Sequence, residues 1–237
     1  MIAASLFIVA AIVTLLTLSD VEKYSTEIGE VRDVALADGS TMHMNGNTVA
    51  EVRLTEHGRR VRILKGEASF DVAKDKSRPF DVEAHSAVIR AVGTAFNVRM
   101  RPSMVELTVT EGVVQVRSGQ TAPERVGAGA GAVIRPRTVA LTQLDKGCIE
   151  QRLAWRDKMV DFNGETVDQA VAEFNRYREQ PILIGDTRVS SLRIGGRFGT
   201  TDSNAFLGAL QLSLPVKAVT GEDGSIMLLY KDTLAGG

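Results

Sequence analysis

The sequence is poor in the side chains that form crosslinks or bind metals. Cys148 is the only cysteine in the 237 residues, so no disulfide can form within the chain, and an oxidising compartment is neither required nor excluded. The three histidines, His43, His57 and His85, have no spacing that would bring two of them to one metal ion. We therefore expect neither a metal centre nor a cofactor.

The chain also lacks an excess of positive charge. Lys and Arg number 28 against 29 Asp and Glu, which gives a formal net charge of −1 and a pI near 6.3. A protein that binds nucleic acid neutralises phosphates with clustered basic side chains. Nucleic acid is therefore not an expected partner.

Arrangements typical of enzymes are missing as well. Ser69 and Ser118 lie in no nucleophile elbow, and no pair of carboxylates stands out from the other charges. The run Gly127–Gly131 lacks the Lys-Ser/Thr of a phosphate-binding loop and opens no helix, so it predicts a flexible loop. The sequence gives no reason to expect catalytic residues.

One apolar run stands at the N-terminus. Ile2–Leu18 is 17 residues without a charge, and as a helix it would span about 25 Å, slightly less than the roughly 30 Å hydrocarbon core of a membrane. A cleaved signal peptide would need basic residues before the run and a better cleavage site than Thr17-Leu18-Ser19. A buried core helix would show a polar face, which this run lacks. The run predicts a membrane anchor.

The charges after this run suggest its orientation. Asp20, Glu22 and Lys23 begin a mostly acidic flank, and a shortage of Lys and Arg is typical of the non-cytoplasmic side. We therefore expect a single pass through a membrane, with the bulk of the chain on the non-cytoplasmic side.

From residue 28 to residue 136 the pattern is all-β. Turn signals such as Asp38-Gly39 and Asn45-Gly46-Asn47 recur at intervals typical of a sandwich, a barrel or a solenoid. Few segments in this range favour a helix. The sequence predicts a mainly β domain over 28–136, solenoid-like or sandwich-like.

The centre of this domain is Ala87–Val98, which has apolar residues at both odd- and even-numbered positions. The pattern predicts one central strand that is covered on both faces, with Gly93 as a bulge within it. The segments around Gly66 and Gly112 flank it with a shared pattern. In each of them one strand is predicted to end and a second to begin at the glycine.

The character of the sequence changes between Pro136 and Trp155. Residues 137–154 are expected to form a connector, and Trp155, the sole tryptophan, is expected to pack where two domains meet. A second, α+β domain is predicted over 155–237.

Helix-start signals organise this second domain. Thr166 and Gln169 form a capping box, and Thr201-Asp202 can cap a second helix. Together with the flanking apolar strands, they predict the order βαββαββ, which is two helix-strand-strand units in tandem.

Four segments of the β domain follow one another in a characteristic order: Lys65–Val72, Arg78-Pro79-Phe80, Val92–Val98 and Val109–Gly112. In this series of motifs the chain resembles the FecR family over roughly residues 28 to 135, and members of that family are transmembrane anti-sigma regulators of bacterial cell-surface signalling. A FecR-like regulator would lie in the inner membrane, with the bulk of the chain in the periplasm. The C-terminal domain resembles the short N-terminal signalling fold shared by secretins and TonB-dependent transducers.

The resemblance implies a function in signalling. The chain would bind the signalling domain of an outer-membrane TonB-dependent receptor and relay its occupancy to an extracytoplasmic-function sigma factor, for iron or siderophore uptake. The sigma factor would bind a cytoplasmic segment that is not present in this sequence. Two alternatives stay open. One is a structural periplasmic adaptor of an envelope assembly without sigma-factor control. The other is a processing hydrolase, which the missing acid–base arrangement disfavours.

One peptide bond is a candidate for self-processing. Gly93-Thr94 places a hydroxyl beside a glycyl carbonyl that no side chain shields. A strained bond of this kind can undergo an N-to-O acyl shift, which gives an ester that water hydrolyses. Some members of the resembled family are cut in this region. The alternative is that Gly93 only forms a bulge and Thr94 is an ordinary strand residue.

Partner binding is expected on a sheet edge of the C-terminal domain, because edge strands leave backbone groups unpaired. The candidate edges are Ile182–Ile184, with Ile182 and Ile184 as contact residues, and Leu192–Phe198. Arg193 and Arg197 on the second edge are expected to face solvent and to steer an acidic partner. The alternative is that both are ordinary surface charges.

Overall fold

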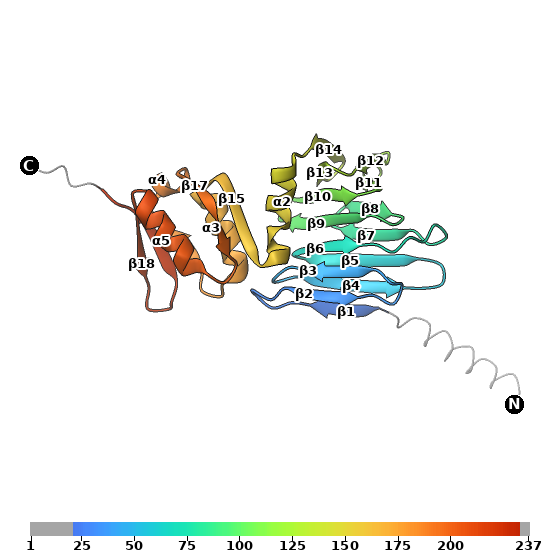
Figure 1. Cartoon of the computed structure of the whole chain (residues 1–237), viewed down its shortest axis with the longest axis horizontal. Coiled ribbons are helices and arrows are strands. Elements are labelled where there is room, and N and C mark those ends of the chain that lie inside the picture. The colour runs from blue at the N-terminus through green and yellow to red at the C-terminus, as the bar shows by residue number, and fades with distance from the viewer. Residues whose placement is uncertain (1–20, 233–237) are drawn as a thin grey trace, which may run out of the picture.

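A computed structural model describes residues 21–232 of the chain. It forms a stack of β-strands followed by a smaller part that contains helices and strands (Figure 1). The membrane anchor predicted at Ile2–Leu18 lies outside the described residues. None of the helices within 21–232 combines the length and the hydropathy that a membrane span needs.

Two seven-stranded sheets form the first part, and their buried side chains share one core. Neighbouring strands are antiparallel except for β5 and β7, which are parallel. The first sheet has the order β1 (Glu22–Ser25), β4 (Val49–Leu54), β5 (Arg59–Lys65), β7 (Phe80–Ala84), β8 (Ala87–Ala91), β11 (Val113–Ser118) and β12 (Glu124–Gly127). The second has the order β14 (Thr138–Gln143), β13 (Ala130–Arg135), β10 (Met104–Glu111), β9 (Ala95–Arg101), β6 (Glu67–Asp71), β3 (Thr41–Met44) and β2 (Arg32–Ala35).

The chain passes from one sheet to the other after every one or two strands. Successive strands therefore rise through the stack roughly in sequence order (Figure 1). The β-rich N-terminal region that the turn spacing predicts is confirmed, and its form is a sandwich.

Glycines mark several of the crossings between the sheets. Gly66 joins β5 to β6 with a φ of +91°, and Gly112 joins β10 to β11 with a φ of +76°. A Cβ on Gly66 would lie 2.3 Å from the Thr48 hydroxyl oxygen, so a larger residue would strain the backbone and clash. The predicted strand ends at these two glycines are confirmed.

The prediction of one continuous strand over Ala87–Val98 is wrong. β8 ends at Ala91 in the first sheet, β9 begins at Ala95 in the second, and Gly93 turns the corner with a φ of +90°. Odd-numbered residues such as Ile89 are buried before the corner, and even-numbered residues such as Phe96 are buried after it. Apolar residues occur at both odd- and even-numbered positions because the register changes at the corner, and not because one strand is covered on both faces.

Two boundaries also differ from the predictions. The loop expected over Gly127–Gly131 shrinks to a turn at Ala128-Gly129, because β13 already begins at Ala130. The sandwich does not stop at residue 136, because β14 pairs with β13 and takes up Thr138–Gln143 of the expected connector.

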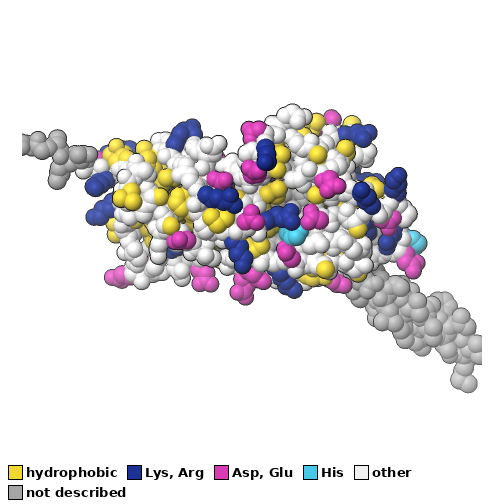
Figure 2. Space-filling model, in the orientation of Figure 1, with side chains coloured by type: hydrophobic (Ala, Val, Ile, Leu, Met, Phe, Trp, Pro, Cys, Tyr) yellow, Lys and Arg dark blue, Asp and Glu magenta, His cyan; other side chains and the backbone are white. Residues whose placement is uncertain are grey.

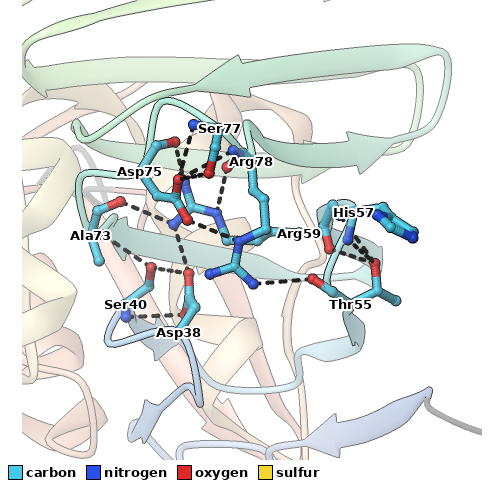
Figure 3. A network of polar contacts seen from close by, with 10 residues as sticks. Asp38, Ser40, Thr55, His57, Arg59, Ala73, Asp75, Ser77 and Arg78 are labelled. Atoms are coloured by element: carbon cyan, nitrogen blue, oxygen red, sulfur yellow. Dashed lines mark hydrogen bonds and ion pairs between the residues drawn. The ribbon is translucent and has the colours of Figure 1, made fainter.

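A buried arginine ties a surface loop to the sandwich (Figure 3). The Arg59 side chain is fully buried and donates to Asp38 Oδ2 at 2.8 Å, the Ala73 carbonyl at 3.0 Å and the Arg78 carbonyl at 2.7 Å. These bonds fix the loop between β6 and β7. Lys74 of that loop lies against the Gly93 corner, where an added Cβ would come within 2.3 Å of Lys74 Cγ.

The second part begins with a helix that follows the sandwich directly. Its elements are α2 (Lys146–Leu153), the 3-10 helix η1 (Ala154–Asp157), β15 (Met159–Thr166), α3 (Val167–Phe174), the 3-10 helix η2 (Asn175–Tyr177), β16 (Ile182–Ile184), α4 (Thr187–Ser190), β17 (Arg193–Gly199), α5 (Ser203–Ser213), β18 (Val216–Thr220) and β19 (Ile226–Tyr230). From β15 onward this order differs from the predicted βαββαββ by the short helix α4 between β16 and β17.

The strands of this part form two sheets. β15 and β17 make an antiparallel pair, while β16, β19 and β18 make a three-stranded sheet in that spatial order. The predicted capping box at Thr166 and Gln169 is present at the start of α3, and Asp202 caps α5 by accepting from Ala205 N at 3.0 Å. Phe174 on α3 stacks on Phe206 of α5 at 4.2 Å between ring centroids, which joins the two helices in one core.

Candidate functional site

A buried carboxylate lies where the sandwich meets the second part. Glu67, the first residue of β6, is 1% exposed. Asn45 Nδ2 and Asn97 Nδ2 each donate to it at 3.0 Å from within the sandwich. Arg176 of η2 donates to it at 2.7 Å from the other part. The negative charge of Glu67 is thus neutralised across the boundary between the two parts.

A second pair of charges completes the contact. Arg99 of β9 pairs with Glu173 of α3, and Arg176 also donates to Glu173 at 3.1 Å. Arg99 Nε lies 3.9 Å from the Glu67 carboxylate. The charges of these four side chains therefore alternate in sign and sum to zero. We call the four residues the junction network: Glu67, Arg99, Glu173 and Arg176.

Burial and neighbouring charge oppose each other in this network. Burial raises the pKa of Glu67, but the Arg176 and Arg99 charges and the bonds from Asn97 and Arg176 outweigh it, so the pKa lies below its ordinary value of 4.5. Burial lowers the pKa of Arg176, and the charges of Glu67 and Glu173 reverse that shift. Glu67 and Arg176 are therefore both ionised at neutral pH.

An aromatic ring packs beside the junction network. Tyr177 is 7% exposed, and a Cβ added to Gly46 of the sandwich would lie 3.5 Å from its ring. The Tyr177 hydroxyl is buried and has no hydrogen-bond partner within the described chain. Burial raises its pKa above the ordinary 10.0; the charge of Arg176 and the Asn45 side chain oppose this shift, and the charges of Glu173 and Glu67 add to it.

A histidine between two carboxylates makes a further contact across the boundary. His43 Nδ1 lies 2.6 Å from Asp33 Oδ1, and its Nε2 lies 2.8 Å from Asp71 Oδ2. Arg156 of η1 reaches the same His43 nitrogen at 2.9 Å and Asp71 at 3.4 Å. Figure 2 shows side chains of both signs, with a histidine among them, along the junction of the two parts.

A cleft of about 720 Å³ opens between the outer face of β9 and β10 and the elements α2, β15 and α3. Trp155 and Asn97 contribute to its walls, and each has a buried polar atom, Trp155 Nε1 and Asn97 Oδ1, without a partner in residues 21–232. Trp155 therefore lies where the two parts meet, as its position in the sequence predicts. Within those residues, no group of three or more His, Cys, Asp and Glu side chains is placed to hold a metal ion.

The candidate processing bond lies at the Gly93 corner. Thr94 is 6% exposed, its carbonyl accepts from Val72 N at 3.0 Å, and its hydroxyl has no hydrogen-bond partner among the described residues. The bond thus lies at a glycine corner with a φ of +90° at Gly93, and the Thr94 hydroxyl next to it is unpaired among the described residues. β9 starts at the next residue, so Arg99 of the junction network lies only about 17 Å further along the same strand.

The residues predicted to bind a partner are divided between two sheets. Ile182 is 1% exposed and belongs to the core, while Ile184 is half-buried at the edge strand β16. Arg193 and Arg197 are exposed on β17, where Arg193 donates to the Gly164 carbonyl and Arg197 lies 3.7 Å from Asp157. The structure does not bring the two predicted edges together.

Sequence reasoning missed the junction network. The sequence around Glu67 indicates only the start of a strand, and 109 positions separate this residue from Arg176. No local pattern connects the two residues. A buried position for Glu67 is hinted at only by the apolar residues that follow it in β6.

Comparison with known proteins finds one matching family and similar solved structures. Residues 22–115 match the family model described as FecR protein. None of the curated proteins compared with the chain matches it. Two crystal structures of a proposed anti-sigma factor from Parabacteroides distasonis ATCC 8503 are similar to this chain, each with a TM-score of 0.75. The structure at 2.50 Å resolution is 25% identical and covers 90% of this chain and 100% of its own, and the structure at 1.65 Å is 24% identical and covers 88% and 99%. The segment 22–115, which contains Glu67 and the Gly93-Thr94 bond, thus matches the FecR family.

Proposed function

We propose that this chain is the sensing part of a sigma-factor regulator. The observation that carries the proposal is the FecR match over residues 22–115, which includes the strands that hold Glu67 and Arg99. The likeness of most of the chain to a proposed anti-sigma factor supports the same role. In this role the chain controls the activity of a sigma factor and carries out no reaction on a substrate.

The signal in this proposal comes from outside the cytoplasm. The C-terminal part, 155–237, acts as a secretin/TonB short N-terminal-like domain and binds the signalling domain of an outer-membrane TonB-dependent receptor. Ile2–Leu18 anchors the chain in the inner membrane, with the bulk of it in the periplasm. Its charge-free composition and the acidic flank after it support this topology. The sigma factor binds a cytoplasmic segment outside this sequence, and the genes under its control serve iron or siderophore uptake.

The junction network gives this relay a physical basis. A receptor that binds the C-terminal part must transmit force or a change of orientation to the sandwich. Removing one partner of a buried ion pair costs about 3–5 kcal/mol, so Glu67 and Arg176 hold the two parts together against small perturbations. The two parts therefore respond to a partner as one body unless the partner disrupts this network.

Cleavage at Gly93-Thr94 belongs to the same proposal as a processing step. The Thr94 hydroxyl attacks the Gly93 carbonyl carbon, the peptide C–N bond breaks to free the Thr94 amine, and water then hydrolyses the ester. The positive φ of Gly93 and the unpaired Thr94 hydroxyl support this step. Both fragments would stay paired through the second sheet, because β9 is hydrogen-bonded to β6 and β10.

Binding to a receptor tests the proposal. The full chain is titrated by calorimetry with the signalling domain of each TonB-dependent receptor encoded in the same genome. We expect one of them to bind with a stoichiometry of one to one. Absence of binding to all of them would contradict the relay and would favour the alternative, a structural adaptor of the envelope.

A further inference from the structure

The strand β15 has an open edge that faces the cleft. It pairs only with β17, so its other side has no strand neighbour within residues 21–232. Thr200 N donates to the Lys158 carbonyl on the β17 side. Because backbone groups alternate along a strand, those of Met159, Asp161 and Asn163 point to the open side.

Two side chains occupy this open edge in place of a strand. Gln151 of α2 donates through Nε2 to the Asp161 carbonyl at 3.0 Å, and its amide also contacts the Glu165 carboxylate. Glu165 in turn accepts from the backbone N–H of Asn163. One donor and one acceptor are thus supplied where an incoming strand would supply its own. Native proteins protect exposed edges with polar and charged side chains.

The space beside this edge is large enough for a peptide. The cleft volume of about 720 Å³ is within the range of roughly 300–1,000 Å³ that ligand sites occupy. The edge from Met159 to Asn163 is about 16 Å long at roughly 3.3 Å per residue, which accommodates an extended segment of about five residues. Met159, Asp161 and Phe162 of β15 line the cleft directly.

The charges of the cleft are unbalanced. Several charged side chains of the cleft are already paired. The two basic ones are Arg99 and Arg101, and the three acidic ones are Glu67, Glu106 and Glu173. Three further acidic side chains of the lining form no ion pair in the described chain: Asp161, Glu165 and Asp168. The one remaining basic side chain among the lining residues is Arg152, which donates to the Thr108 hydroxyl. A basic side chain on an incoming segment would therefore find acidic partners.

We propose that the outer edge of β15 binds an extended, basic segment of a partner protein. The segment enters the cleft, displaces the Gln151 and Glu165 side chains and adds a third strand to the β15–β17 sheet. This inference goes beyond the proposed function, because it rests on the edge, the cleft and their charges and holds for any partner that carries such a segment. It also differs from the edges predicted from the sequence, which lie on β16 and β17.

The test uses the full chain and a blocked hexapeptide of alternating lysine and valine. Trp155, the sole tryptophan, is in the cleft wall and reports occupancy through its fluorescence, and calorimetry gives the affinity. Two matched peptides serve as controls, one with glutamate in place of lysine and one with lysine retained but with N-methyl groups on alternate amides. We expect both to bind at least about tenfold more weakly, because the first loses charge complementarity and the second loses backbone bonds.

A pair of variants separates edge pairing from simple surface attraction. Gln151→Ala removes a competitor for the Asp161 carbonyl, so the lysine–valine peptide should bind severalfold more tightly. Gln115→Ala, at an exposed position of β11 in the sandwich, should leave its affinity unchanged. Equal binding of the parent and the N-methylated peptide, or weaker binding to Gln151→Ala, would overturn the proposal. Absence of binding at roughly millimolar peptide would overturn it as well.

Discussion

Replacing Arg176 by alanine should destabilise the contact between the two parts more than any change to an exposed ion pair. The substitution leaves the Glu67 carboxylate, which is 1% exposed, with two amide donors and with Arg99 Nε at 3.9 Å. Its solvation in water is not restored, because Glu67 remains buried within the sandwich. Glu173 also loses one of its two basic partners.

The size of the effect follows from the burial of this pair. Breaking a buried ion pair by removing one partner costs about 3–5 kcal/mol. In a chain of this length each kcal/mol lowers the melting temperature by about 2–4 °C, so we expect Arg176→Ala to lower it by roughly 6–20 °C. The assay is thermal unfolding followed by circular dichroism and by calorimetry, which also shows whether one transition separates into two.

An exposed pair in the sandwich provides the matched control. Arg60 lies 3.2 Å from Glu83, with side chains that are 59% and 33% exposed. Arg60→Ala should change stability by less than about 1 kcal/mol. A shift for Arg176→Ala no larger than the shift for Arg60→Ala would refute the reasoning. The double variant Glu67→Gln with Arg176→Met should be less destabilised than the sum of its single changes, since neither charge is then left alone.

Substitutions at four further positions test the described geometry. The pKa of Glu67 lies below its ordinary 4.5, so its stabilising contribution is complete above pH 4.5 and is lost as the pH falls through the lowered value. Glu67→Gln should therefore make the free energy of unfolding depend less on pH in the acid range. An unchanged dependence would contradict this. Tyr177→Phe should raise stability by about 1 kcal/mol, because it removes an unpaired buried hydroxyl. It should also abolish the loss of stability above pH 10 that the raised pKa of Tyr177 predicts, and a loss that persists in the variant would refute this origin. Thr94→Ala should keep the chain intact and Thr94→Ser should retain cleavage, as read by mass spectrometry of the purified protein; an intact wild-type chain would exclude processing at this bond. Arg193→Pro should abolish receptor binding in calorimetry if the edge of β17 is used, since proline removes a donor and fixes φ, and unchanged affinity in a variant shown to be folded would place the docking site elsewhere.

Features with a local cause could be predicted from the sequence. The strand ends at Gly66 and Gly112 are readable because a positive φ favours glycine, and the capping box at Thr166 is readable because both partners lie within one helical turn. The change of pattern around Trp155 likewise predicts its place at the junction.

Features that depend on distant contacts could not be predicted. The pattern of Ala87–Val98 fits a strand covered on both faces as well as two strands joined at a corner, and only the pairing of β8 and β9 in opposite sheets decides between them. The junction network joins Glu67 and Arg176 through tertiary packing, so neither residue signals the other. Likewise, the open edge of β15 emerges only when the four strands after it are placed in two sheets.

Transcription in the host tests the central proposal, control of a sigma factor, most directly. A reporter under a promoter of the extracytoplasmic-function sigma factor encoded nearest to this gene is measured with and without the inducing ligand of the receptor. The measurement compares the wild-type strain, a strain without the gene, and that strain complemented with the wild-type gene or with Arg176→Ala. We predict that deletion removes the dependence of transcription on the ligand, that the wild-type gene restores it, and that Arg176→Ala restores it only in part. Reporter activity that responds to the ligand equally in the deletion strain and in the wild type would contradict the proposal.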